Sequence, residues 1–185
     1  MDKEFEDGVR RLLERLGEDP GRPGLRETPR RVLESLEFLT RGLREDRPAL
    51  TAGGLFEEES RDLVLVRNIE FVSLCEHHLL PFLGHAHVGY IPDGRILGLS
   101  RIARVVDHFA CRPQVQERMT REIADHLTEV LRPRGLGVQV TALHLCMVAR
   151  GVRKQDAEVV SFAWRGSFEQ DMQTRSEFLR ATEKG

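Results

Sequence analysis

Residues 62–78 read DLVLVRNIEFVSLCEHH, and at this stretch the hydrophobic pattern of the chain changes from helical to extended. Apolar side chains recur with a period of two between residue 62 and Cys75, which predicts a β-strand. The strand ends in Cys75-Glu76-His77-His78, four successive side chains that can each bind a metal ion or transfer a proton. The same stretch therefore indicates a β-sheet and a site of chemistry at one end of it.

The part of the chain before this strand is predicted to hold two helices. Apolar residues recur at helical spacing between residues 3 and 16. Thr28 is expected to cap a second helix, because a proline follows it at a position where helices tolerate proline. The polar segment 44–61 is expected to be a loop. We therefore assign residues 1–60 to an N-terminal helical segment and residues 61–185 to one continuous domain.

Strand and helix patterns follow one another in the rest of the chain. The remaining strands are expected at 84–91, at a short stretch that ends at Gly98, at 137–149 and at 158–164. The remaining helices are expected after Ser100 as N-cap, after Arg112-Pro113, and at about 171–182. This order predicts an α+β fold with an antiparallel sheet backed by helices.

Length and charge limit the classes of protein to consider. The 185 residues suit one domain, and three cysteines do not suggest a disulfide framework. A net charge of −2 argues against nucleic-acid binding, which usually requires a basic excess. No apolar run reaches the ~18–20 residues of a membrane helix, and the N-terminus is too polar for a signal peptide. We expect a cytoplasmic protein with no nucleic-acid partner and no membrane partner.

A metal site is the strongest chemical hypothesis. Cys75 and His78 are three residues apart, which lets a thiolate and an imidazole reach one ion from a tight turn. His144 and Cys146 are two apart on a predicted strand, so they are expected to project from the same face. A site made of Cys75, His78 and Cys146 would offer two sulfurs and one nitrogen, which suits Zn²⁺. Three protein ligands would leave the fourth tetrahedral position open, as in catalytic zinc sites.

His77 and His144 would then remain near the ion without binding it, available for proton transfer. The alternative for any single buried cysteine is that it packs as a small hydrophobic residue. Cys111 has no neighbouring ligand and is expected to be a helix-end cysteine of this kind. The other histidines are expected to serve packing or the surface, with His85 and His87 on a strand face and His108 and His126 solvated or capping helices.

A phosphate site is predicted at the start of one helix. Ser100, Arg101 and Arg104 combine a hydroxyl, backbone N–H groups at a helix N-terminus and two guanidinium groups, which suits phosphate. The alternative is a solvated basic helix face. Arg150 follows the second His/Cys pair and could bring a further positive charge to an anionic substrate.

A base-recognition site is predicted at the start of the next helix. Gln114, Gln116 and Glu117 form a polar cluster there. A carboxylate such as that of Glu117 is the natural acceptor for two adjacent N–H donors on a guanine edge. The alternative is that Glu117 is an ordinary surface residue of a helix.

Four motifs in the same order resemble the GTP cyclohydrolase I family over about residues 10–180. Ser73–His78 is similar to that family's S-x-C-E-H-H signature, and Arg112–Arg118 to its R-x-Q-x-Q-E-R signature. The other two are His144–Gly151, which matches the strand that delivers the last metal ligand, and the N-terminal pattern from Gly17-Glu18-Asp19-Pro20 to Thr28-Pro29. The resemblance implies a tunnelling fold (T-fold) and a toroidal homodecamer of two pentameric rings, with sites shared between neighbouring subunits. It also implies the conversion of GTP and water to 7,8-dihydroneopterin triphosphate and formate.

The resemblance implies a role for each candidate residue. Cys75, His78 and Cys146 would hold zinc, and a water activated by that zinc would attack C8 of the purine. His144 would exchange protons with the opening imidazole ring of GTP, and His77 would assist. The substrate contacts would come from Glu117 beside Gln116 for guanine, and from Ser100, Arg101, Arg104 and Arg150 for the triphosphate and ribose.

The sequence departs from the family pattern in two places. The family usually has lysine where Arg101 stands, and residues 159–166, VVSFAWRG, replace a more Thr-rich stretch. Three alternatives to the zinc-dependent GTP hydrolase remain open. They are a zinc-holding protein of the same fold that binds a purine or pterin without turnover, a nitrile-reducing deazapurine enzyme of that fold, and a structural zinc protein.

Overall fold

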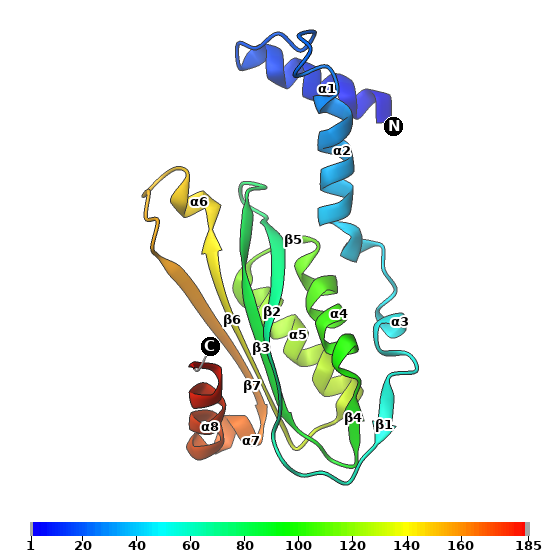
Figure 1. Ribbon diagram of the computed structural model, residues 1–185, viewed down its shortest axis with the longest axis vertical. Coiled ribbons are helices and arrows are strands. Elements are labelled where there is room, and N and C mark those ends of the chain that lie inside the picture. The colour runs from blue at the N-terminus through cyan, green and yellow to red at the C-terminus, as the bar shows by residue number, and fades with distance from the viewer. Residues whose placement is uncertain (1, 184–185) are drawn as a thin grey trace.

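The computed structural model describes residues 2–183 (Figure 1). Its central sheet has five strands, in the order β5 (Pro113–Gln114), β2 (Val64–Cys75), β3 (Pro81–Ile91), β6 (Gly135–His144) and β7 (Glu158–Gly166). All neighbouring strands are antiparallel except β2 and β5, which are parallel. A second sheet pairs β1 (Leu55–Glu57) with β4 (Arg95–Leu97).

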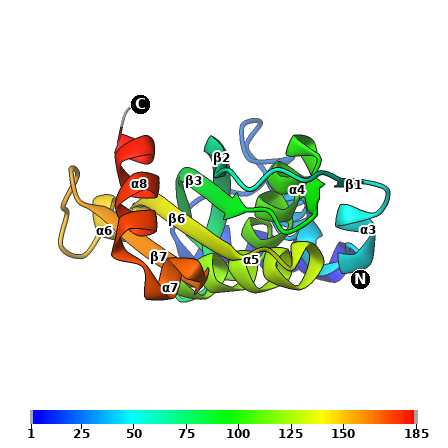
Figure 2. The same cartoon turned by 90° about the horizontal axis from the view of Figure 1, so that it is seen from below.

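Two long helices, α4 (Leu99–Ala110) and α5 (Gln116–Leu131), cover one face of the central sheet (Figure 2). Alternate side chains of β3 point at them, and Ala86, Val88 and Tyr90 are fully buried there. Burying a large apolar side chain stabilises a fold by roughly 1.5–3 kcal/mol, so this layer holds the core together. Among the helices of residues 2–183, none combines the length and the apolar character needed to cross a membrane.

The opposite face of the sheet is covered at one end by the C-terminal helices, α7 (Ser167–Gln170) and α8 (Met172–Glu183). Phe178 of α8 packs directly on Gly89 of β3, where a Cβ atom would lie 2.7 Å from the phenyl ring. A side chain at position 89 would therefore displace α8. Towards the other end of this face Val72 and Leu83 remain exposed.

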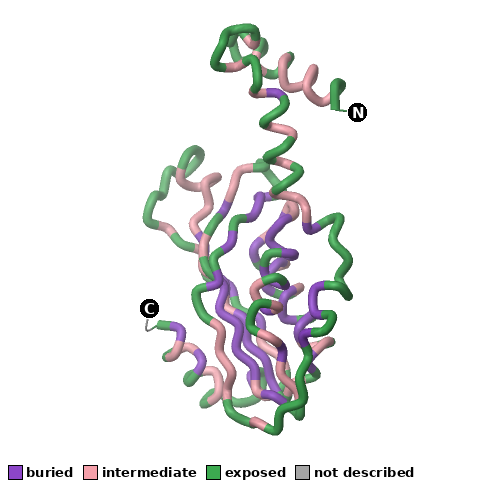
Figure 3. Tube along the Cα trace, turned by 45° about the vertical axis from the view of Figure 1, so that its right-hand side comes forward, coloured by how far each residue is buried: buried purple, intermediate pink, exposed green. Residues whose placement is uncertain are grey.

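The N-terminal part of the chain consists of α1 (Asp2–Arg15), α2 (Thr28–Leu39), the short 3-10 helix η1 (Arg41–Leu43) and α3 (Arg47–Thr51). The predicted pair of helices, α1 and α2, extends away from the sheet (Figures 1 and 3). No described residue of α1 is buried. The connection to the main body is fixed at Gly42, whose N–H donates to Cys111 O (2.9 Å) and whose C=O accepts from Arg112 Nη2 (3.0 Å).

The predicted α+β tunnelling-fold class is confirmed in its antiparallel-rich sheet, its covering helices and its N-terminal helical pair. Both predicted N-caps, however, are wrong. α2 already includes Thr28, and α4 begins at Leu99, so that Ser100 lies inside its first turn. The N-cap of α4 is Gly98, an extended residue whose C=O accepts the hydrogen bond from Arg101 N (2.8 Å).

Two expected segment types also differ. Segment 44–61 is not a continuous loop, because Leu50 of α3 is buried and residues 55–57 pair with β4. The predicted strand at 137–149 ends at His144, and one helical turn, α6 (Leu145–Val148), follows it. The division at residues 60 and 61 stays a prediction.

His108 and His126 were expected to be solvated or capping, and both are buried, at 1% and 7% exposed. Arg112 Nη2 lies 2.6 Å from His108 Nε2. Because arginine only donates, that nitrogen is an acceptor, and Nδ1 donates to Glu45 Oε2 (3.3 Å). Among the described residues His126 Nε2 has no hydrogen-bond partner. Burial, followed by nearby arginine charge, lowers the pKa of both histidines, so the fold favours their neutral forms.

We expect acid to destabilise the fold through these histidines. Because the pKa of His126 in the fold lies below its ordinary value of 6.5, the unfolded chain binds more protons. The free energy of unfolding therefore falls as the pH drops below 6.5, by up to about 1.4 kcal/mol per pH unit for each such histidine. Urea unfolding between pH 7.5 and 5.5 should show a shallower pH dependence in His126→Phe than in the wild type. An equal slope in His126→Phe and the wild type would contradict the explanation.

Candidate functional site

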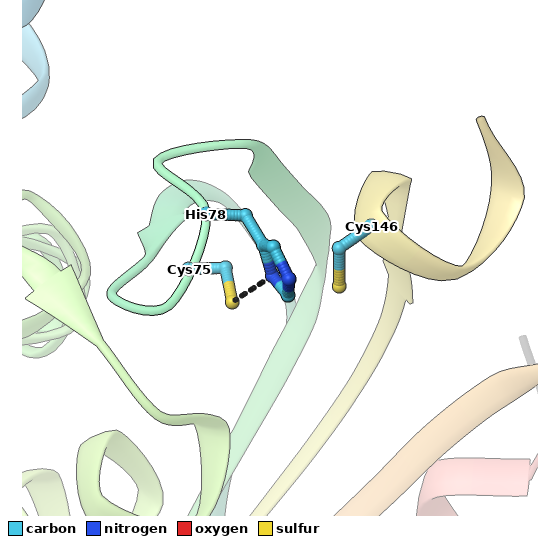
Figure 4. A group of neighbouring side chains, drawn as sticks. All are labelled: Cys75, His78 and Cys146. Atoms are coloured by element: carbon cyan, nitrogen blue, oxygen red, sulfur yellow. Dashed lines mark hydrogen bonds between the residues drawn. The ribbon is translucent and has the colours of Figure 1, made fainter. Parts of the chain in front are cut away.

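The three predicted metal ligands lie together at one end of the sheet (Figure 4). Cys75 ends β2, His78 lies in the turn that follows, and Cys146 lies in α6. One ligand atom from each, the two Sγ atoms and an imidazole nitrogen, lie within 4.8 Å of one another. The fold therefore brings together two segments that are far apart in the sequence.

Strand pairing is what makes the two segments meet. β3 pairs with β2 on one side and with β6 on the other. At the end of these ladders Leu74 lies opposite Pro81, and Phe82 lies opposite His144. The residues that follow β2 and β6 therefore emerge next to each other, on either side of the start of β3.

The turn after β2 gives the first half of the cluster its shape. The C=O of Cys75 accepts from the N–H groups of His78 (3.3 Å) and Leu79 (2.8 Å), and its own N–H donates to Leu80 O (2.9 Å). Leu79 has a φ of 53°, in the left-handed region, which reverses the chain within a few residues. Figure 4 shows the side chains of Cys75 and His78 directed toward Cys146.

Cys146 reaches the cluster by a different route from the one predicted. It does not share a strand face with His144, because β6 ends at His144 and Cys146 belongs to the helical turn α6. This turn carries the thiol across toward β2 (Figure 4). The expected grouping is formed, but the geometric reason given for it was wrong.

The donor set fits a soft divalent metal ion. Tetrahedral sites hold sulfur and nitrogen at ~2.0–2.3 Å from the ion, which puts neighbouring ligand atoms roughly 3.5–3.8 Å apart. The ligand atoms of this cluster lie within 4.8 Å of one another, so a shift of about 1 Å would bring them to the separations of a tetrahedral site. Burial raises the pKa of the Cys146 thiol, and the neighbouring Cys75 raises it further. A cation between the two sulfurs would favour their deprotonated forms, so metal binding and thiol ionisation are coupled.

His144 sits beside this cluster in a fixed orientation. Its ring stacks on the fully buried Phe82, with 4.6 Å between ring centroids and an interplanar angle of 2°. Its Nε2 lies 2.8 Å from Gln116 Oε1. Burial lowers the pKa of His144, while the negative charge of Glu117 opposes that shift. The ring is therefore held by contacts on its face and on its edge.

His77 points away from the core and is largely exposed, although its Nδ1 lies only 3.8 Å from Cys75 Sγ. The preceding residue, Glu76, forms an ion pair with Arg118 of α5, with 2.5 Å between Oε2 and Nη2. The Arg118 hydrogen bond lowers the pKa of Glu76. This pair ties the ligand-bearing turn to the start of α5.

Gln116 and Glu117 are the first two residues of α5, and they differ in burial. Gln116 is 1% exposed, and its side chain bonds to strands β6 and β7 as well as to His144. Glu117 is exposed and, with Arg121, lines a surface pocket of about 570 Å³ along β7. Residues 162–165, which belong to the departure at residues 159–166, line the same pocket.

The structure does not bring Ser100, Arg101 and Arg104 to the cluster within one chain. These residues begin α4 beside β4, whereas the cluster lies at the other end of the sheet (Figure 1). At a rise of ~1.5 Å per residue, Ser100 lies about 15 Å and Arg104 about 9 Å of helix before the end of α4 at Ala110. Arg150, in contrast, follows α6, and its positive charge acts on Cys146.

Sequence reasoning missed three features of the site. They are the stacking of Phe82 on His144, the Glu76–Arg118 ion pair, and a buried hydroxyl pair, Ser161 and Thr120, beneath Gln116. The alternation along the second predicted strand would have placed Phe82 on the buried face. The other two depend on the strand register and on the direction of α5, which no local pattern contains.

Comparison with known proteins gives matches over nearly the whole chain. A family model described as GTP cyclohydrolase I matches residues 5–183. The protein named GTP cyclohydrolase 1 from Alkalilimnicola ehrlichii is 47% identical over 180 residues, which cover 97% of each chain. Its namesake from Gloeobacter violaceus is 52% identical over 173 residues, 94% of this chain and 81% of that one. Among solved structures, the archaeosine synthase QueF-Like in the apo form has a TM-score of 0.47 at 20% identity, covering 56% of this chain and 93% of that chain.

Proposed function

This chain belongs to the GTP cyclohydrolase I family and converts GTP to dihydroneopterin triphosphate, and we propose that the cluster of Cys75, His78 and Cys146 is the centre of its active site. The observation that carries the proposal is the grouping of these three ligand atoms within 4.8 Å, with His144 held beside them. The cytoplasmic location expected from the sequence stays a prediction.

We propose zinc as the metal, held by Cys75, His78 and Cys146. Two sulfurs and one imidazole nitrogen are a donor set that zinc prefers, and three protein ligands leave one tetrahedral position open. When bound, zinc would supply a Lewis acid and lower the pKa of a water molecule toward about 7. The exposure of His78 supports an open side of the site, since the other two ligands are buried or half-buried.

We assign proton transfer to His144 and His77. Burial lowers the pKa of His144, which favours the neutral ring that can accept a proton. It would exchange protons with the imidazole ring of the purine while that ring opens and its carbon leaves as formate. His77, exposed beside Cys75, would assist from the solvent side.

We assign recognition of guanine to Glu117. Its exposed carboxylate can accept from the N1–H and the amino group of the base, a pair of donors that adenine does not present. The surface pocket beside it, with Arg121, supports this assignment. The substrate-binding role of Gln116 stays a prediction. Its side-chain amide is buried and hydrogen-bonded to the protein.

We propose that the triphosphate is held by residues of two chains. Arg150 follows α6 and can serve the cluster of its own chain. Ser100, Arg101 and Arg104 lie about 9–15 Å of helix before the end of α4, on the side away from the cluster, so they would complete the site of a neighbouring subunit. A complete site then requires self-association, and we propose the toroidal homodecamer that the family resemblance implies.

Exposed sheet edges and apolar side chains support this assembly. Among the described residues, β7 pairs with β6 alone, and β2 has a partner on its outer side only at Leu74 and Cys75. Open edges of this kind invite pairing with another strand. Phe162 on β7 is 45% exposed, and Phe38 beside β2 is 63% exposed and lines a groove of about 470 Å³. A second copy could cover both.

Purified protein loaded with zinc should release formate from GTP and form a product that becomes fluorescent after oxidation. A chelator should abolish both signals, and added zinc should restore them, because the open coordination position supplies the activated water. ATP is the control and should give no formate. Binding of GTP without formate release by the assembled, zinc-loaded protein would instead support a binding protein of the same fold.

Cys146→Ser should lower bound zinc and formate release together, because a serine hydroxyl is a poor zinc ligand compared with a thiolate. The expected loss in activity is at least about 100-fold, measured alongside metal content by atomic absorption. Cys111→Ser is the control, since Cys111 is a buried cysteine that lies outside the cluster, and this variant should retain its zinc. Full zinc retention by Cys146→Ser would refute the ligand assignment.

Two inactive variants should complement each other if the site is shared between chains. Arg104→Ala and His144→Ala, co-expressed with different tags and purified as mixed assemblies, should recover about a quarter of wild-type activity, because that fraction of interfaces joins two intact halves. His144→Ala mixed with Cys146→Ser is the control, since both changes lie in the same half and should not complement. Activity no higher than that of the parents in the first mixture would show that each chain completes its own site.

A further inference from the structure

We propose that Gln116 is a positioning residue, which fixes the nitrogen of His144 that carries the proton. The inference rests on the proposed role of His144 in proton transfer. On this proposal Gln116 acts through His144 and does not contact the substrate.

The orientation of the Gln116 amide is determined by its buried partners. Its Nε2 donates to Val140 O (3.0 Å) and Val159 O (2.9 Å), backbone carbonyls of two adjacent strands, and lies 3.1 Å from Ser161 Oγ. A flipped amide would place Oε1 against these two carbonyl oxygens, which cannot donate. The oxygen of Gln116 therefore faces His144.

The hydroxyl pair beneath the amide has a consistent direction. Thr120 Oγ1 donates to the backbone C=O of Gln116 (2.8 Å), which uses its single proton. The short contact between Thr120 Oγ1 and Ser161 Oγ (2.7 Å) must then be donated by Ser161. Ser161 Oγ therefore turns its lone pairs toward Gln116 Nε2, whose two protons are shared among three nearby acceptors. The hydroxyl pair thus agrees with the amide direction that the two strand carbonyls require.

The direction of the amide decides the tautomer of His144. Because Gln116 Oε1 can only accept, the Nε2 of His144, 2.8 Å away, must carry the proton. A neutral imidazole has one N–H group, so Nδ1 is left with its lone pair. Stacking on Phe82 at 2° fixes the plane of the ring, and the contact with Gln116 fixes which edge holds Nε2. Nδ1 is thus the nitrogen that keeps a lone pair.

The same contacts argue against a direct role of Gln116 in binding. Its side chain is 1% exposed, and both ends of its amide are bonded to the protein. A substrate group could reach it only by displacing His144 or a strand carbonyl. Glu117, the next residue, is exposed and has no such restriction.

The test compares two substitutions that disturb the strand carbonyls in similar ways but differ toward His144. Gln116→Met keeps the length of the side chain and removes the acceptor. Gln116→Glu keeps an acceptor oxygen for His144. We expect Gln116→Met to lower kcat for formate release about 100-fold with KM for GTP within threefold, and Gln116→Glu to recover at least tenfold of that loss. Zinc content should stay at the wild-type level in both.

Ser161→Ala is the matched control, because it removes one partner of Gln116 Nε2 without touching His144, and it should keep at least half of kcat. If Gln116→Met does not assemble, Gln116→Asn replaces it. The asparagine amide is too short to reach His144, so this variant should lower kcat by a similar factor. Equal loss in the Met (or Asn) and Glu variants, at equal zinc content and thermal stability, would overturn the inference. A raised KM with unchanged kcat would overturn it in favour of substrate contact. Absence of formate release by the wild type would instead refute the proposed function itself.

Discussion

The pairing of β3 with β2 on one side and β6 on the other is the constraint on which the site depends. It sets Phe82 opposite His144 and Leu74 opposite Pro81, so the segments that follow β2 and β6 meet at one end of the sheet. A slip of one residue in either ladder would turn each side chain to the opposite face. His144 would then leave the layer under α5 and lose both Phe82 and Gln116. The register of two strands thus fixes the metal-binding cluster and the histidine beside it together.

A buried polar network keeps that histidine in place inside an otherwise apolar layer. Gln116, Thr120 and Ser161 are all within a few per cent of full burial and lie between α5 and the two last strands. An unpaired polar group there would cost about 1–3 kcal/mol, so such a network is stable only when each donor meets an acceptor. Here His144 Nε2 donates to the Gln116 amide oxygen, Ser161 donates to Thr120, and Thr120 donates to the backbone C=O of Gln116. The same contacts that satisfy the network therefore also determine the chemistry available at His144.

Local sequence patterns predicted the parts of the site that local structure determines. Cys75 and His78 meet because one turn joins them, and their spacing already shows this. Cys146 was assigned correctly for a wrong reason, because nothing in an apolar run indicates that a strand gives way to one helical turn. The burial of His126 could have been predicted, since it lies three residues after Ile123 on the apolar face of its helix. The separation of Ser100 from the cluster could not be predicted, because it depends on the end of the sheet at which each helix begins.

That separation also limits the kinds of assembly that could complete the site. The start of α4 and the cluster lie at different ends of the same sheet (Figure 1). The two sparsely paired edges belong to different strands, β2 and β7, on opposite sides of the sheet. Pairing β7 of one chain with β2 of the next continues the sheet and uses unlike surfaces, which is a heterologous contact. Heterologous contacts close into rings when the rotation between subunits allows it. A curved sheet made of repeated chains could therefore bring the basic start of one α4 toward the metal-binding cluster of a neighbour, which a single chain cannot do for itself.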